Sequence, residues 1–90
     1  MRLFKRYKYY IDGEKVSKKY FEYNLKMMML ITDPETIEKL AKVYDCQNYS
    51  IEEVCSIMLS IFDRYKIILD GVMNKGFIDL LGCRYEIRRA

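Results

Sequence analysis

The fold is decided near the start of the chain by residues 6–17, which read RYKYYIDGEKVS. From residue 3 to residue 11 the side chains alternate between two sides, as they do in a strand with one buried face and one wet face. The Asp12-Gly13 pair that follows predicts a two-residue turn, because a type I′ turn needs positive φ at both central positions. The sequence therefore predicts an N-terminal β-hairpin.

The register of this hairpin assigns each side chain to one face of the sheet. Pairing across the turn puts Tyr9 opposite Val16 on the core side, and Tyr10 opposite Lys15 on the outer side. The outer side is therefore expected to be cationic and aromatic. Its expected residues on these two strands are Phe4, Arg6, Lys8, Tyr10 and Lys15.

The end of the chain, FIDLLGCRYEIRR at residues 77–89, predicts a second hairpin. A two-residue turn at Leu81-Gly82 gives one register that puts apolar pairs on one face and a charged pair on the other. The expected pairs are Leu80 with Cys83, Ile78 with Tyr85, and Asp79 with Arg84.

Three helices are expected between the hairpins. Ser17 is a candidate N-cap for the first, which should end near Ile31. Thr32-Asp33-Pro34-Glu35 is a start signal for the second, with proline in the first turn and glutamate at the positive end of the helix dipole. Ser50-Ile51-Glu52-Glu53 is a capping box for a long third helix that Gly76 would end.

The third helix has one competing interpretation, because Asp70-Gly71 would also suit the turn of a hairpin that starts near Tyr65. We favour the helix, since one interior glycine costs only ~1 kcal/mol. Of the three consecutive methionines, we expect two to fill the core and Met27 to face out, against the alternative of a pliable binding surface. The expected apolar stripes are Ile37, Leu40, Ala41 and Tyr44 on the second helix, and Val54, Ile57, Met58, Ile61, Phe62, Tyr65, Ile68, Leu69 and Val72 on the third.

The element order is therefore hairpin, three helices, hairpin. Two isolated hairpins are each marginal, so we expect them to join in one four-stranded antiparallel sheet with the helices on one face. This is an α+β fold in a single domain, residues 1–90. The second hairpin would add Arg84, Glu86 and Arg88 to the outer side.

The composition of the chain limits the classes of protein to which it can belong. The chain has 90 residues and a net charge of +3, with 51% hydrophobic and 32% charged residues. Residues 1–31 hold eight Lys/Arg and three Asp/Glu, while residues 32–75 hold five and eight, so the start is basic and the middle acidic. No apolar run is long enough to span a bilayer or form a signal peptide. We expect a cytoplasmic protein without a membrane partner.

The sequence offers little for catalysis. It contains no histidine, and none of the common nucleotide-binding, hydrolase or metalloprotease motifs occurs in it. Cys46, Cys55 and Cys83 are an odd set without a paired spacing, so we expect buried free thiols rather than disulfides or a zinc site. We therefore expect no enzyme, no cofactor and no metal. An orphan enzyme would need a pocket that gathers several carboxylates or Cys83.

The basic outer side of the sheet is the candidate site. It suits a protein partner, because Tyr and Arg anchor interfaces, and it suits nucleic acid, because cations bind phosphates while aromatic rings stack on bases. Lysine and tyrosine also keep exposed strands soluble, so solvation is the third interpretation. Exposed sheet edges leave a homodimer open. The candidate binding residues are Phe4, Arg6, Lys8, Tyr10, Lys15, Lys18, Lys19, Arg84 and Arg88.

The run YKYYIDGEKVSKKYF resembles the opening of many small accessory proteins of phages and mobile elements, and the ending GCRYEIRR is similar to their last strand. The resemblance covers roughly a third of the chain. It implies a non-enzymatic inhibitor or modulator that binds a host protein or nucleoprotein complex, with anti-CRISPR proteins among the examples, in the cytoplasm of the host. Many such inhibitors are acidic mimics of DNA, whereas this chain is basic at both ends.

Overall fold

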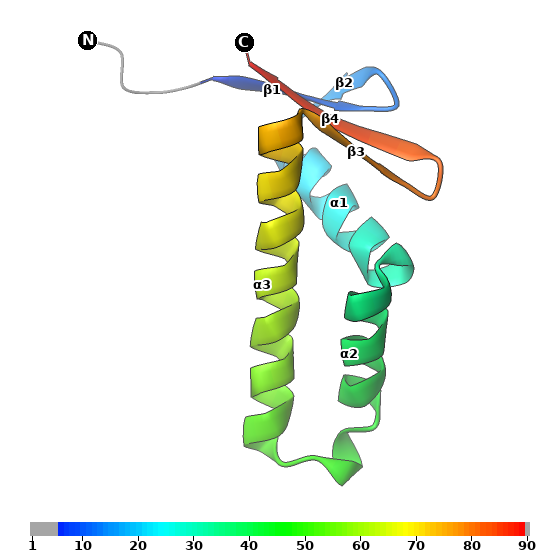
Figure 1. Cartoon of the computed structure of the whole chain (residues 1–90), viewed down its shortest axis with the longest axis vertical. Coiled ribbons are helices and arrows are strands. Elements are labelled where there is room, and N and C mark those ends of the chain that lie inside the picture. Colours follow the sequence, from blue (N-terminus) through cyan, green and yellow to red (C-terminus); the bar gives the residue numbers. More distant parts are fainter. Residues whose placement is uncertain (1–5, 90) are drawn as a thin grey trace, which may run out of the picture.

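The computed structural model describes residues 6–89, apart from the side chain of Cys46, and its elements follow the predicted order (Figure 1). Two hairpins flank three α-helices, and the third helix is the long one. The elements are β1 (Tyr7–Ile11), β2 (Glu14–Val16), α1 (Lys18–Thr32), α2 (Pro34–Tyr44), a short 3-10 helix η1 (Cys46–Asn48), α3 (Ile51–Lys75), β3 (Phe77–Leu80) and β4 (Cys83–Arg89).

The two hairpins join in one antiparallel sheet of order β2-β1-β4-β3, as predicted. Both turns have positive φ at their two central residues, 52° and 82° at Asp12 and Gly13, and 50° and 79° at Leu81 and Gly82. These values are those of a type I′ turn, whose twist matches the twist of the strands. The predicted registers across both turns are confirmed, including Tyr9 with Val16.

Asp12 also joins one hairpin to the other. Its carboxylate accepts hydrogen bonds from the backbone N–H of Arg84 at 2.8 Å and from the thiol of Cys83 at 3.3 Å. Its own backbone N–H donates to the carbonyl of Arg84 at 2.8 Å. The residue that makes the first turn therefore also holds the end of the β1–β4 ladder.

The helices begin and end where the capping signals predict. The Ser17 hydroxyl accepts from the N–H of Tyr20, and Ser50 with Glu53 forms a complete capping box. Gly76 ends α3 with a φ of 97°, a left-handed conformation that glycine adopts without strain. Because α3 runs unbroken through Gly71, the long helix is confirmed and the hairpin alternative is wrong.

The core lies between the inner side of the sheet and the helices α1 and α3. Phe21 is its centre: its ring lies 5.2 Å from the ring of Tyr9 and 5.7 Å from that of Tyr85. Met29 is buried, Met28 packs against the core while partly buried, and Met27 is 46% exposed, which agrees with the prediction for the methionine run. The buried apolar residues are Phe21, Leu25, Met29, Ile61, Tyr65, Ile68, Val72, Tyr85 and Ile87.

The corner between α1 and α2 is fixed by Asp33, which is 7% exposed. Its carboxylate caps α2 by accepting from the backbone N–H and the hydroxyl of Thr36, at 3.0 and 2.7 Å. Arg64 of α3 binds the same carboxylate through two nitrogens, at 3.1 and 3.0 Å. The hydrogen bonds from Arg64 lower the pKa of Asp33 most, and those from Thr36 lower it further, so that it is about 2.

The predicted buried stripe of α2 is partly wrong. The side that faces α3 carries Thr36 and Leu40, whereas Ile37 is 43% exposed and Tyr44 is 83% exposed. The reason is the corner, because the Thr36 hydroxyl bonded to Asp33 turns that side of the helix inward. Leu40 is the one predicted member of the stripe that packs against the core, and Ala41 is exposed as well.

Two further burial predictions fail on α3. Met58 and Phe62 were expected in the core but are 37% and 53% exposed. Cys55 is an exposed free thiol and Cys83 a half-buried one, where buried thiols were predicted. Met58, Phe62 and Cys55 lie on a side of α3 that the described chain leaves uncovered, whereas Cys83 belongs to β4. The prediction for the Cys46 thiol falls on a side chain that lies outside the described residues.

Candidate functional site: the outer face of the sheet

The outer face is the side of the sheet turned away from the helices. Side chains directly opposite each other on neighbouring strands share a face, so the register determines its members. Lys8 lies opposite Arg88, and Tyr10 lies opposite Glu86. The described residues of the outer face are Lys8, Tyr10, Lys15, Phe77, Asp79, Arg84, Glu86 and Arg88.

Two arginines of the outer face stack on aromatic rings. The guanidinium carbon of Arg88 lies 4.1 Å from the ring centroid of Tyr10, and that of Arg84 lies 3.9 Å from the ring centroid of Phe77. Each contact joins residues from different strands, so the sheet register creates it. Stacks of this kind contribute about 0.5–1 kcal/mol at exposed sites. They hold both guanidinium groups close to the rings.

Both arginines also have acidic neighbours on the outer face. Arg84 lies 3.7 Å from Asp79, and Arg88 lies 3.3 Å from Glu86. No ion pair within residues 6–89 involves Lys8 or Lys15. The four cations and two carboxylates leave the outer face with a net charge of about +2, and the lysines carry the charge that is not neutralised.

The structure brings five of the nine predicted site residues together on the outer face. They are Lys8, Tyr10, Lys15, Arg84 and Arg88. Phe4 lies outside the described residues. Arg6 precedes β1 and, with Lys18, lines a groove on the other side of the sheet, while Lys19 is exposed on the first turn of α1.

Phe77 is the site residue that the sequence analysis missed. The sequence predicts Phe77 as the first residue of the second hairpin but does not assign it to a face, and in the structure it lies opposite Glu86 on the outer face. The signal was present, because continuing the predicted register by one residue beyond the pair of Ile78 with Tyr85 places Phe77 opposite Glu86. The stack of Arg84 on Phe77 follows from the same register.

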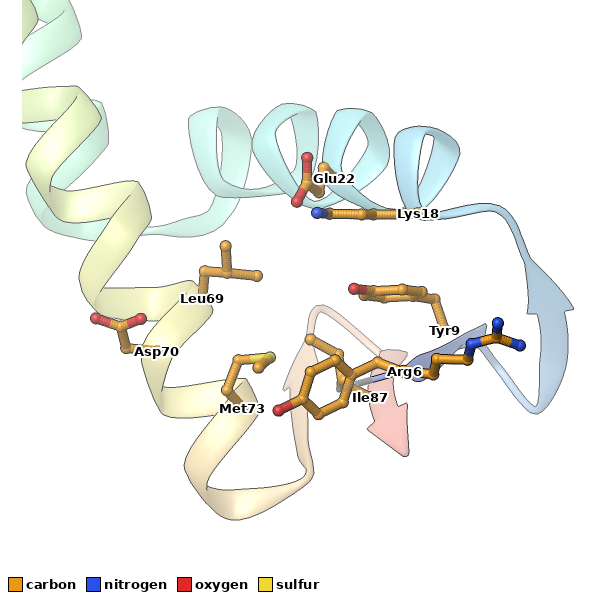
Figure 2. A pocket seen from close by; sticks show the side chains of 9 residues that line it. Arg6, Tyr9, Lys18, Glu22, Leu69, Asp70, Met73 and Ile87 are labelled. Atoms are coloured by element: carbon orange, nitrogen blue, oxygen red, sulfur yellow. The ribbon is translucent and has the colours of Figure 1, made fainter. Parts of the chain in front are cut away.

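A groove, which we call the sheet–helix groove, lies between the inner side of the sheet and the helices α1 and α3 (Figure 2). Its volume is about 620 Å³, and its apolar wall is made by Tyr9, Leu69, Met73 and Ile87. Cations and carboxylates are present in equal number at its rim, which therefore selects no ligand charge. The charged residues that line it are Arg6, Lys18, Glu22 and Asp70.

Tyr65 is buried in the core, and its hydroxyl has no hydrogen-bond partner among the described residues. Burial makes the largest contribution, and the neighbouring Glu22 and Tyr9 make smaller ones, to a pKa of Tyr65 that is raised to about 12. The phenol is therefore neutral near pH 7. Tyr85 differs, because its hydroxyl donates to the side chain of Asn24.

Cys83 does not have the surroundings of a nucleophile. Partial burial and the carboxylate of Asp12 both raise the pKa of its thiol, which disfavours the reactive thiolate. The described part of the chain gathers no group of three or more Cys, Asp or Glu residues that would hold a metal ion. The chemistry that the outer face supports is binding through charge, hydrogen bonds and stacking.

Comparison of the chain with protein-family models, with curated proteins and with solved structures gives no match. Among the helices of residues 6–89, none combines the length and the apolar character needed to cross a bilayer. The function is therefore argued from the geometry of the site.

Proposed function

We propose that this chain is a non-catalytic accessory protein that binds and inhibits or modulates a host protein or nucleoprotein complex through the outer face. The observation that carries the proposal is the pair of stacked arginines, Arg84 on Phe77 and Arg88 on Tyr10, beside two lysines that have no ionic partner within residues 6–89. Arginine and tyrosine anchor protein interfaces more often than other residues.

The stacks favour binding because they fix the long side chains in advance. Immobilising a flexible side chain costs about 0.5–1.5 kcal/mol on association, and stacking of Arg84 and Arg88 removes part of that cost. The guanidinium N–H groups at the edge of each stack remain able to donate to carboxylates. An acidic surface of a partner protein therefore fits the outer face.

A protein surface fits better than bare nucleic acid for two reasons. The rings of Tyr10 and Phe77 are already covered by guanidinium groups, so a base would have to displace an arginine to stack there. Asp79 and Glu86 also lie among the cations and would repel phosphates. The setting, a phage or mobile element acting on host machinery such as a CRISPR effector, comes from the resemblance of the first and last strands.

The second candidate is a small DNA- or RNA-binding module that uses the same face. Its supporting observation is the adjacency of three cations, with Lys8 directly opposite Arg88 and Lys15 opposite Tyr10. In that case affinity would fall steeply with salt, because each phosphate contact releases counterions.

The test is capture from a lysate of host cells with the full chain as bait, with and without nuclease. The variants are Lys8→Glu and Lys15→Glu, singly and together, and the control is Lys42→Glu on the exposed side of α2. We expect a stoichiometric protein partner that survives nuclease, binds the control and is lost from the double variant. Recovery of no stoichiometric partner contradicts the proposal.

A nucleic-acid probe separates the two candidates. Fluorescence anisotropy with labelled single-stranded and duplex oligonucleotides should show weak binding that Lys8→Glu changes little. Tight binding that falls steeply with salt, and that is lost in Lys8→Glu but kept in Lys42→Glu, would favour the second candidate instead.

A further inference from the structure

A row of large apolar side chains is uncovered on one broad side of the helices far from the sheet. We call this the α2–α3 face and define it as Ile37, Tyr44, Ile51, Met58 and Phe62. Their exposed fractions are 43, 83, 82, 37 and 53%, respectively. Surface leucines and isoleucines occur singly on most proteins, but a contiguous apolar patch on a small protein marks an interaction site.

The row on α3 follows the spacing of a helix–helix seam. One stripe of α3, which includes Ile57 and Ile61, packs inside the fold. Ile51, Met58 and Phe62 form a second stripe with Cys55, at steps of four, three and four residues, which is the step pattern of a coiled-coil position. The long helix therefore has two apolar stripes. One packs against the rest of the fold, and the described chain leaves the other uncovered.

The exposed residues of α2 lie on the same broad side as this second stripe. Successive residues of a helix are about 100° apart, so Ile37 and Tyr44 lie about a quarter turn beyond the side of α2 that faces α3. Ile51 and Phe62 are displaced in the same rotational sense from the side of α3 that faces α2. The two helices run in opposite directions (Figure 1). A rotation in the same sense about each helix's own axis therefore places both stripes on the same side of the helix pair.

The same side of the molecule also has apolar hollows that are large enough for an aromatic side chain. Met58 and Phe62, together with Leu30 of α1, line an apolar groove of about 160 Å³. An apolar cavity of about 150 Å³ accommodates a benzene-sized group. Further along the same side of α3, Leu69 and Met73 line the sheet–helix groove (Figure 2).

The described part of the chain is also more extended than a compact domain of its length. Its radius of gyration is 15.4 Å, whereas a compact domain of 90 residues has about 12 Å. The principal extents are 50 × 35 × 19 Å, so the molecule is a thin plate. Within residues 6–89, thirteen large apolar side chains are exposed and nine are buried. A chain with this balance buries more apolar surface by associating.

The distribution of charge along the chain indicates what kind of partner fits this face. Residues 33–63, which form α2 and the half of α3 far from the sheet, hold seven Asp/Glu and two Lys/Arg, a net charge of −5. The other described residues, 6–32 and 64–89, hold twelve Lys/Arg and six Asp/Glu, a net charge of +6. A second copy placed antiparallel sets the acidic end of each molecule against the basic end of the other.

We propose that the α2–α3 face binds a second copy of this chain, with α3 antiparallel to α3 of the other copy and a two-fold axis near Phe62. In this arrangement each Phe62 enters the groove beside Met58 of the opposite copy. Ile51 of one copy lies beside Leu69 and Met73 of the other. The contact is self-complementary, as a two-fold interface requires.

The available surface is of the size that a stable dimer needs. The segment of α3 from residue 51 to residue 73 is roughly 33 Å long, and α3 with a flanking helix is roughly 20 Å wide. Their projected area of roughly 660 Å², with the extra surface of protruding side chains, approaches the ~800 Å² per partner of a standard interface. The outer faces of the two sheets would then point away from each other, so the dimer would be bivalent.

The test is sedimentation of the full chain through the micromolar range. We expect a species of twice the chain mass whose dissociation constant rises by a factor of about 30 or more in Phe62→Glu, since a central anchor contributes 2 kcal/mol or more. Ile51→Glu should weaken it in the same direction. The matched control is Ile67→Glu, because Ile67 is 60% exposed on the opposite side of α3 and should not change the dimer.

A photo-crosslinker reports the geometry. With p-benzoylphenylalanine at position 62, irradiation should give a covalent dimer, and at position 67 it should not. A wild-type chain that stays monomeric throughout overturns the proposal. So does a dimer that Ile67→Glu or Met27→Glu dissociates while Phe62→Glu, folded by circular dichroism, leaves it intact, since Met27 belongs to the separate exposed side of α1. Neither result bears on binding by the outer face.

Discussion

Replacing Asp33 should cost more stability than replacing any exposed carboxylate of the chain. Asp33 accepts two hydrogen bonds from Thr36 and two from Arg64, and it is 7% exposed. Loss of a helix cap costs about 1 kcal/mol, and loss of a hydrogen bond to a charged group about 1.5–3 kcal/mol. Because the Arg64 side chain is 30% exposed and also contacts Glu35, water and Glu35 recover part of the second contribution. We expect Asp33→Ala to destabilise by about 2–3 kcal/mol.

The pH dependence of the stability reports on the same corner. The pKa of Asp33 falls from 3.8 in the unfolded chain to about 2 in the fold. One pKa unit corresponds to about 1.4 kcal/mol, so the ionised carboxylate contributes roughly 2 kcal/mol. Because the folded pKa is depressed, this contribution is complete above about pH 5 and is lost as the pH falls toward 2. In Asp33→Asn this part of the acid sensitivity should disappear.

The assay is urea unfolding followed by helical circular dichroism at neutral pH and at pH 4 and 3, at one fixed protein concentration. Asp63→Ala is the matched control, because Asp63 is an exposed carboxylate on α3. The reasoning is refuted if Asp33→Ala and Asp63→Ala lower the free energy of unfolding equally. It is also refuted if the Asp33→Asn variant loses stability with acid as steeply as the wild type.

Three further predictions concern single side chains. Gly71→Ala should stabilise the chain by about 0.5–1 kcal/mol in urea unfolding, because Gly71 is helical and no atom of the described residues lies within 4 Å of the added carbon. Tyr65→Phe should raise the melting temperature, because the hydroxyl it removes is buried without a partner within residues 6–89, whereas Tyr85→Phe should lower it. Alkylation at neutral pH, mapped by mass spectrometry, should label the exposed Cys55 faster than Cys83, whose thiol pKa is raised by burial and by Asp12. Equal labelling rates would contradict the last of these.

The sheet could be predicted because short stretches of sequence determine its turns and its register. Asp12-Gly13 and Leu81-Gly82 each fix a turn, and the turn fixes the register of every pair that follows. The helix ends could be predicted for the same reason, since Ser17, Ser50 and Gly76 act on residues within one turn of themselves. Lys8, Tyr10, Lys15, Arg84 and Arg88 therefore lie on one face, as the alternation indicates.

The rotation of α2 could not be predicted because it depends on a distant residue. Ile37 is more apolar than Thr36, so the pattern favours burying Ile37. Thr36 instead faces inward because its hydroxyl binds the carboxylate of Asp33, which is itself held by Arg64, 31 residues away in the sequence. On α3 the sequence indicates which positions are apolar, but not which of two apolar sides the rest of the chain covers. Phe62 is exposed for this reason.

The central claim is that the outer face is the surface that binds the partner, and lysine footprinting tests it most directly. The purified chain and its captured complex would be acetylated briefly, and modification of each lysine would be measured by mass spectrometry. Lys8 and Lys15 are exposed on the outer face, and Lys42 is exposed on α2. We predict that acetylation of Lys8 and Lys15 falls in the complex while that of Lys42 does not change. Equal acetylation of Lys8 and Lys15 with and without the partner would contradict the claim.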